Sequence, residues 1–218
     1  METASLSPWE ITAKLPYVRR SAGNRGGEKM TPIFTIHAGE YLAGEKLEKR
    51  FPDCDVWVPS KDRGIDLLVT NKKDRHKSAA LQIKLSKDYV PVQEPDVQQR
   101  YDSWGWWSFE LTKIEENIKN TNPDFWILMI YSFAKKDIRC VIIKPAELRN
   151  RLVAIHGKEK PFKPYLWITK DNKCFETRSL KSAEKDRILE GDYSGIEGSK
   201  KDFTEYLDNW EPLEKLIA

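Results

Sequence analysis

The chain has 218 residues, of which 39% are hydrophobic and 33% are charged, a composition that predicts one ordered, soluble α/β domain with an appendage. Its formal net charge of +3 does not by itself indicate nucleic-acid binding, because many solvated surfaces have this balance. No run approaches the roughly 20 apolar residues of a membrane span, and residues 1–15 contain no continuous apolar segment, so we expect neither a membrane protein nor a signal peptide.

The first 33 residues contain several prolines and glycines and no sustained hydrophobic period, which predicts an N-terminal arm with at most short structure. Residues 36–51 then follow a helical pattern. Glu40 is the one acid on the apolar stripe of this helix, whereas Glu45 and Glu48 lie off it. A carboxylate on such a stripe is costly unless it is paired, hydrogen-bonded or bound to a metal. The alternative is a helix-start carboxylate that interacts with the helix dipole.

Five strands are predicted in the middle of the chain by short apolar or alternating runs between polar turns. They cover residues 55–58, 65–70, 79–86, 125–132 and 138–143. The polar segment between the second and third strands predicts a long antiparallel hairpin. A helix that ends near Asn120 is expected before the fourth strand.

Three further elements are predicted after the last of these strands. They are a short helix over residues 145–148, a hairpin formed by 165–170 and 173–177, and an amphipathic helix over 203–210 that Pro212 interrupts or restarts.

Two of the predicted strands contain polar residues that local rules do not favour. Asp66 lies between Ile65 and Leu67, although aspartate has a low strand propensity. Alternation along residues 79–86 places one set of side chains on a polar face, opposite three apolar side chains. The polar set is Gln82, Lys84 and Ser86, and the apolar set is Leu81, Ile83 and Leu85. Such local inconsistencies are expected at functional sites.

These residue types suit the hydrolysis of a phosphodiester. The reaction requires an activated water and cations that offset charge on the phosphate and the leaving oxygen. Mg²⁺ prefers oxygen ligands, which Asp66, Glu40, the Gln82 amide and the Ile83 backbone carbonyl supply, while Lys84 orients the water or stabilises the phosphate. The three histidines are scattered and no GxSxG motif is present, so serine and cysteine nucleophile schemes lack support.

The chain resembles the PD-(D/E)XK phosphodiesterases, the restriction-endonuclease-like superfamily, whose core runs helix, three strands, helix, strand. Asp66 matches the acid on the second core strand, Gln82-Ile83-Lys84 matches the acid, variable residue and lysine on the third, and Glu40 matches the acid that many members place on the helix. The commonest members carry Asp or Glu where this chain has Gln82. The Gln-x-Lys pattern is similar to that of Mrr-type restriction enzymes.

The resemblance implies an α/β fold with a mixed central sheet flanked by helices. It divides the chain into an N-terminal arm over residues 1–33, a catalytic core over 34–148, and a C-terminal extension over 149–218 that carries the hairpin and the last helix. The extension and the arm are the candidate regions for substrate specificity.

The implied activity is Mg²⁺-dependent endonucleolytic hydrolysis of DNA phosphodiester bonds. Mn²⁺ is expected to substitute for Mg²⁺, and double-stranded DNA is the expected substrate.

A neutral amide at Gln82 leaves Asp66 and Glu40 as the charged side chains of the site. We therefore expect one firmly held metal ion, with any second ion depending on substrate phosphate. The alternative is a catalytically inactive nuclease-fold protein that acts as a nucleic-acid-binding or assembly module, and metal binding separates the two readings.

Several basic and aromatic residues are candidates for DNA contacts. Those flanking the proposed site or lying on the arm are Lys61, Arg63, Ser86, Lys87, Arg19 and Arg20. The alternative for the charged residues is an ordinary solvated surface. Trp104, Trp106 and Trp107 are placed either against bases or in a core or subunit interface. Cutting both strands at one locus commonly uses two active sites, which suggests a homodimer.

The three cysteines are odd in number, widely spaced and without a CxxC pair. This pattern argues against a disulfide framework and against a structural zinc site. Together with the expected lack of a signal peptide, it predicts a protein of a reducing compartment, and we expect it in the cytoplasm.

Overall fold

The computed structural model describes residues 37–60, 64–91, 93–158 and 161–218. The chain divides into two compact units, Met1–Pro32 and Ile33–Ala218. The first unit lies wholly outside the described residues, and so do four of the predicted DNA-contact residues, Arg19, Arg20, Lys61 and Arg63. The fold below is that of the second unit.

A mixed five-stranded sheet forms the centre of this unit, in the order β1-β2-β3-β5-β6. The strands are β1 (Cys54–Trp57), β2 (Leu67–Asn71), β3 (Ser78–Lys87), β5 (Phe125–Ser132) and β6 (Asp137–Ile143). β3 pairs with β5 in parallel, and the other neighbours pair antiparallel, including the predicted hairpin of β2 and β3. The predicted α/β class and mixed sheet are therefore confirmed.

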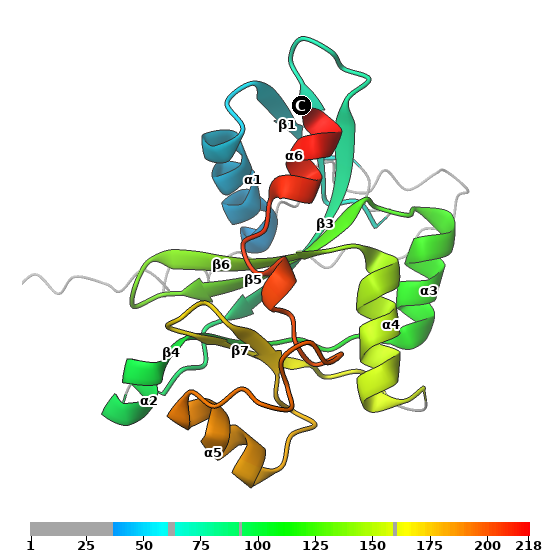
Figure 1. Cartoon of the computed structure of the whole chain (residues 1–218). Helices are drawn as coiled ribbons and strands as arrows, with labels where there is room; N and C mark the ends of the chain where they lie inside the picture. The colour runs from blue at the N-terminus through cyan, green and yellow to red at the C-terminus, as the bar shows by residue number, and fades with distance from the viewer. Residues whose placement is uncertain (1–36, 61–63, 92, 159–160) are drawn as a thin grey trace, which may run out of the picture. The chain divides into compact units, whose positions relative to one another are not determined.

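Helices and a second sheet cover the two faces of the central sheet (Figure 1). α1 (Ala38–Arg50) and α6 (Glu211–Ile217) pack on one face, and α3 (Leu111–Asn120) and α4 (Pro145–His156) contribute to the core on the other. Alternation along β5 sends Ile127 to the first core and Leu128 to the second. This strand is apolar from Phe125 to Ile130 because both of its faces are covered.

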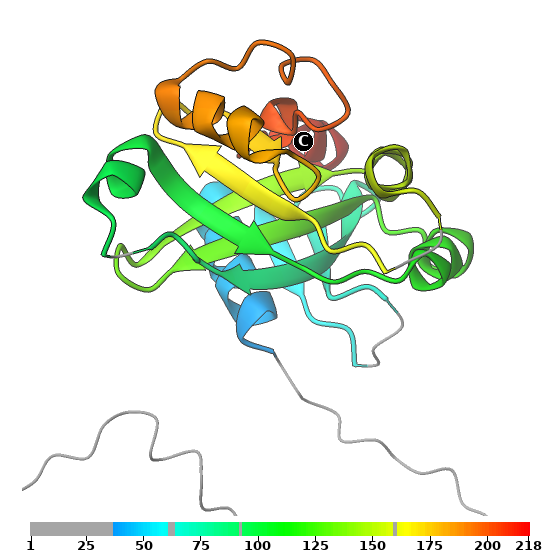
Figure 2. The same ribbon diagram turned by 90° about the horizontal axis from the view of Figure 1, so that it is seen from below.

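The second sheet is antiparallel, in the order β4-β7-β8, and Figure 2 shows it from below. Its strands are β4 (Tyr101–Trp106), β7 (Tyr165–Thr169) and β8 (Cys174–Glu176). Leu166 and Ile168 face the central sheet, whereas Trp167 packs with Ile188 of α5 (Ser182–Glu190). The sequence predicts the β7–β8 hairpin, but not β4, α5 or α2 (Pro95–Arg100).

Most predicted elements are observed with shifted ends. α1 falls within the predicted range 36–51, and α4 extends beyond the predicted residue 148 to His156. None of the helices in the described part of the chain has the length and hydrophobicity needed to span a bilayer. The three cysteines are free and buried, and burial raises the pKa of Cys140 to about 12.

The predicted helix over residues 203–210 is wrong. Only a 3₁₀ turn, η2 (Thr204–Tyr206), forms there, and α6 begins at Glu211 with Pro212 in its first turn. Asp208 has a φ of +47° and exchanges hydrogen bonds with the backbone of Cys140 on β6. Pairing with the edge of the central sheet thus replaces the helix that the local pattern favours.

An ion-pair cluster centred on Arg139 joins the two sheets and the C-terminal segment. Its guanidinium donates to Asp102 of β4 and to Asp208, each at 2.6 Å, and to Asn172 in the β7–β8 turn at 2.9 Å. Burial alone raises the pKa of Asp102, but hydrogen bonds and charge from Lys135 and Arg139 outweigh it and hold that pKa below its ordinary value. The cluster therefore stabilises the fold while these carboxylates are ionised.

We expect Arg139→Ala to lower the free energy of unfolding at pH 7 by about 2 kcal/mol, because it removes the only guanidinium that pairs with Asp208 and leaves Asp102 with Lys135 alone among the described residues. The loss should shrink as the pH falls below about 4, because a carboxyl group with a depressed pKa stabilises the fold only above its titration range. Urea unfolding measures both effects. Arg149→Ala, which removes a more exposed ion pair with Glu115, is the control and should cost less than about 1 kcal/mol. Equal losses for the two variants would contradict this role of Arg139.

Candidate metal and catalytic site

The candidate site lies where β2 and β3 separate. β2 begins at Leu67, opposite Leu81, whereas β3 continues to Lys87 beside β5. Asp66 directly precedes β2, although the sequence places it inside the strand, and its N–H donates to the Leu81 carbonyl at 2.8 Å. Its Oδ2 accepts the Ile83 N–H at 2.6 Å. A carboxylate thus takes the place of a backbone partner at the point of separation.

Three oxygen or nitrogen groups of β3 accompany this carboxylate. A strand residue points its N–H and C=O to the same side, so the Ile83 carbonyl faces the side from which Asp66 approaches. Gln82 is 9% exposed, and its Oε1 is buried with no hydrogen-bond partner in the described part of the chain. Lys84 is half-buried, and its Nζ lies 5.8 Å from the centroid of the Trp126 ring. The structure thus brings Asp66, Gln82, Ile83 and Lys84 together on neighbouring positions.

A hydrogen-bonded chain holds the loop that carries Asp66. Trp126 Nε1 donates to Asn117 Oδ1, and Asn117 Nδ2 donates to the Gly64 carbonyl, each at 3.2 Å. Gly64 has a φ of +85°, and a Cβ built there would lie 2.3 Å from Asn117 Nδ2. Only glycine therefore fits this loop without strain. The sequence analysis did not identify Asn117 and Trp126 as supports of the site. The only local signal is that Asn117 is an amide at the margin of the apolar stripe of α3.

Glu40 lies on the first turn of α1. The adjacent Gly39 packs so closely on β3 that a Cβ there would lie 2.9 Å from the Leu85 Cβ and 3.7 Å from Ile83. This contact brings the start of α1 to the strand that carries the site, on the face opposite Gln82 and Lys84. The Glu40 carboxylate is half-buried and accepts the His37 N–H at 3.2 Å. Its observed contact is a helix cap.

The other predicted contact residues near the site occupy different environments. Ser86 is buried, and its hydroxyl donates to the Lys87 carbonyl and accepts the Trp106 N–H at 2.9 Å. Trp107 is also buried, with Nε1 donating to the Lys84 carbonyl at 2.9 Å. Lys87 and Trp106 are exposed. The three tryptophans therefore divide between the core and the surface.

The donor set suits a cation that prefers oxygen ligands. Within the described residues, no three His, Cys, Asp or Glu side chains form a group that could hold a metal. Gln82 offers an amide oxygen in place of an acid. Its buried, unpartnered oxygen and the adjacent Asp66 carboxylate are the kinds of atom that Mg²⁺ binds.

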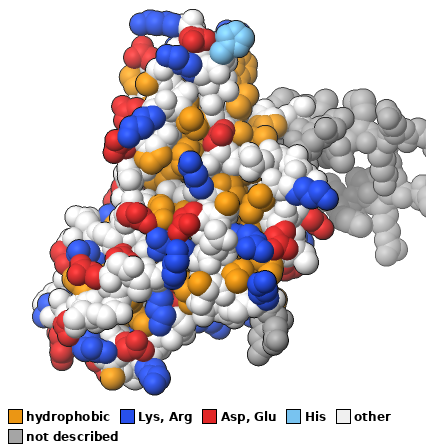
Figure 3. All heavy atoms as spheres, turned by 45° about the vertical axis from the view of Figure 1, so that its right-hand side comes forward, with side chains coloured by type: hydrophobic (Ala, Val, Ile, Leu, Met, Phe, Trp, Pro, Cys, Tyr) orange, Lys and Arg blue, Asp and Glu red, His pale blue; other side chains and the backbone are white. Residues whose placement is uncertain are grey.

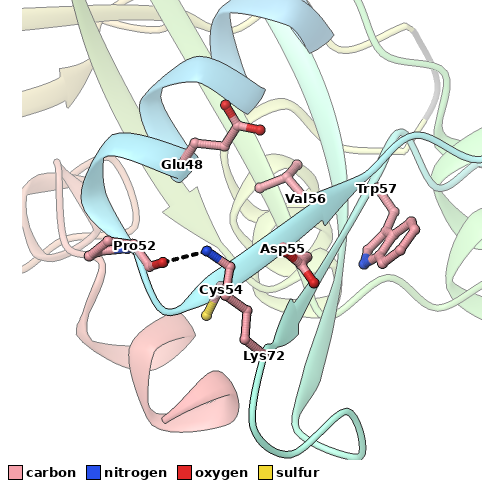
Figure 4. Close-up of a pocket in the computed structure, with 7 residues that line it drawn as sticks. All are labelled: Glu48, Pro52, Cys54, Asp55, Val56, Trp57 and Lys72. Atoms are coloured by element: carbon pink, nitrogen blue, oxygen red, sulfur yellow. Dashed lines mark hydrogen bonds between the residues drawn. The ribbon is translucent and has the colours of Figure 1, made fainter.

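A pocket of about 350 Å³ lies elsewhere, at the outer edge of β1 (Figure 4). Its lining consists of Glu48, Pro52, Cys54, Asp55, Val56, Trp57 and Lys72. Lys72 Nζ donates to the Pro52 carbonyl at 2.7 Å across this pocket. None of the predicted site residues is among these lining residues.

Comparison with protein-family models, with curated proteins and with solved structures finds no match to this chain. The functional assignment therefore rests on the residues and geometry of the site itself.

We expect Gly64→Ala to lower the free energy of unfolding by at least about 1 kcal/mol more than Gly195→Ala. Both glycines have a φ near +84°, at +85° and +83°, but a Cβ at Gly195 meets nothing within 4 Å. Both alanine variants therefore carry the same strain of a positive φ, and only Gly64→Ala adds a steric clash with Asn117. Urea unfolding of both variants measures the difference. Equal losses would show that Asn117 does not confine the loop.

Proposed function

We propose that this protein is a Mg²⁺-dependent endonuclease that hydrolyses DNA phosphodiester bonds, with a PD-(D/E)XK core of the restriction-endonuclease type. The observation that supports this best is the Asp66 carboxylate bound to the Ile83 N–H where β2 and β3 separate. Gln82 and Lys84 flank Ile83 on the same strand. The acid is therefore bonded to the residue that stands between the amide and the ammonium group along β3.

Asp66, the Gln82 amide and the Ile83 carbonyl are the groups that would hold Mg²⁺, with Glu40, in the first turn of α1 on the other face of β3, as a further acid. When bound, Mg²⁺ would supply positive charge that offsets charge developing on the phosphate and on the leaving oxygen. The Ile83 N–H fixes the Asp66 carboxylate in place, which reduces the conformational cost of binding the ion. Mn²⁺, which also prefers oxygen ligands, is expected to substitute.

Lys84 would act on the phosphate or on the attacking water. Within the described residues no carboxylate lies in ion-pair range of its Nζ, and the Trp126 ring supports the ammonium from one side. Its positive charge is therefore not neutralised by any carboxylate among the described residues. Such a group stabilises the negative charge that builds up on a phosphodiester during hydrolysis.

We expect Lys84→Met to reduce the cleavage rate of plasmid DNA in Mg²⁺ by about 10²- to 10³-fold, because it removes the ammonium but keeps the apolar stem over Trp126. Asp66→Asn should cause a similar loss, since the amide oxygen can still accept the Ile83 N–H while the charge is gone. Lys113→Met, which changes an exposed lysine of α3, is the matched control and should cleave normally. Wild-type protein that cuts no plasmid, linear or single-stranded DNA would overturn the proposal.

We expect Gln82→Glu to strengthen Mg²⁺ binding measured by calorimetry, because it adds a carboxylate beside Asp66. In EDTA the same variant should unfold at a lower temperature than the wild type, because a buried carboxylate is then uncompensated. Added Mg²⁺ should raise the unfolding temperature of the variant back to that of the wild type. Gln99→Glu on the exposed side of α2 is the control and should change neither quantity. Unchanged Mg²⁺ affinity in Gln82→Glu would place the ion elsewhere.

A second candidate function is a catalytically inactive nuclease fold that binds nucleic acid or supports an assembly. The neutral Gln82 and the capping contact of Glu40 favour it, because they leave Asp66 as the acid held at the strand separation. Wild-type protein that binds DNA but shows no heat of Mg²⁺ or Mn²⁺ binding would support this function over the enzyme.

A further inference from the structure

The outer face of the second sheet is rich in aromatic side chains. Trp104 and Trp106 of β4 lie in register with Trp167 and Tyr165 of β7, respectively. Tyr89, whose N–H donates to the Trp104 carbonyl at 3.0 Å, lies beside them. We call these five residues the aromatic face. The Trp104 and Trp167 rings are stacked, with centroids 4.5 Å apart and an interplanar angle of 10°.

One end of the aromatic face is covered and the other is open. Ile188 of α5 packs in the same apolar cluster as Trp167, which is buried. In the view of Figure 2, none of the drawn helices lies over β4. Trp106 is 38% exposed and Tyr89 is 40% exposed. Two rings of base size are therefore available to a partner at the open end.

Two lysines place positive charge over these rings. Lys87 Nζ lies 4.8 Å from the centroid of Tyr89, and Lys185 Nζ lies 5.8 Å from that of Trp167. The neighbouring Asp88 carboxylate accepts hydrogen bonds from the N–H groups of Val90 and Trp104, so it is directed toward the backbone. By contrast, Figure 3 shows basic and acidic side chains interspersed on the face that it presents. Aromatic rings beside lysines are the combination that single-stranded nucleic acids bind.

The aromatic face is joined to the candidate site by short contacts. The Trp106 N–H donates to Ser86 Oγ, two residues beyond Lys84 on β3, and Trp107 Nε1 donates to the Lys84 carbonyl. The exposed Trp106 ring is therefore anchored to the strand that carries Lys84.

We infer that the aromatic face binds a single-stranded segment of nucleic acid, with bases stacked on Trp106 and Tyr89 and a phosphate beside Lys87. The inference extends the proposed nuclease function, because it names the form of the substrate next to the site. Binding itself requires neither metal nor cleavage. Single-strand binding of this kind depends on stacking and charge rather than on base sequence.

The test is fluorescence anisotropy of a labelled 20-nucleotide poly(dT) strand with the full chain, at low salt and in EDTA. Wild-type protein should bind this strand more tightly than a blunt 20-base-pair duplex. Trp106→Ala and Tyr89→Ala should each raise the Kd for the strand by about 10-fold. Trp106→Phe, which keeps an aromatic ring, should bind nearly as the wild type does. Phe133→Ala removes another exposed aromatic ring, 72% exposed in the β5–β6 turn, and should leave the Kd unchanged.

Lys87→Glu tests the same surface without a risk of misfolding, because Lys87 is exposed. This variant should raise the Kd for the strand and leave the unfolding temperature unchanged. Failure of wild-type protein to bind the strand would overturn the inference, as would alanine variants that bind like the wild type. A change of oligomeric state in Trp106→Ala, with strand binding unchanged, would assign the face to a second copy instead. Wild-type protein that binds the strand but cuts no DNA in Mg²⁺ fails the nuclease proposal alone.

Discussion

The arrangement of the site depends on the hydrogen bond between the Asp66 carboxylate and the Ile83 N–H. A strand that leaves its neighbour exposes backbone groups that must find other partners. Here the departing chain satisfies one of them with a charged side chain, so the separation of β2 and β3 places an acid against the strand that carries Gln82 and Lys84. Structure and candidate chemistry therefore share one interaction, and loss of the acid would disturb both.

Uncharged side chains hold the loop before Asp66 and the side chain of Lys84 in place. Asn117 links the Gly64 loop to Trp126, and the Trp126 ring lies under the Lys84 ammonium. The loop before Asp66 and the lysine after it are thus positioned by the same tryptophan. Networks of ion pairs lie elsewhere, at Arg139, where they join the two sheets, and at Arg151. Among the described residues, the Lys84 ammonium thus contacts an aromatic ring and no acid.

Local patterns predict the parts of the fold whose burial is regular. β3 alternates between apolar and polar side chains, and α3 repeats with a helical period, so each is recognised from its own residues. β4 was not predicted because Gly105 interrupts a run of tryptophans. The position of β4 depends on the close contact of Gly105 with Ile130 of β5, which leaves no room for a Cβ. The helix expected over residues 203–210 fails for a similar reason. Asp208 pairs with Cys140, a partner 68 residues away that no local pattern reveals.

The sequence by itself determined the order of the central elements, the polar face of β3, and the selection of Asp66, Gln82 and Lys84, because period-2 alternation and strand propensity act over a few residues. Only the tertiary structure decided that Asp66 binds the Ile83 N–H, that Glu40 caps α1, and that the buried Gln82 oxygen has no hydrogen-bond partner among the described residues. It also separated Trp106 at the surface from Trp107 in the core. These outcomes depend on the residue at which each strand ends and on the side chains that pack against it. Such contacts join residues far apart in the chain, so no local pattern predicts them.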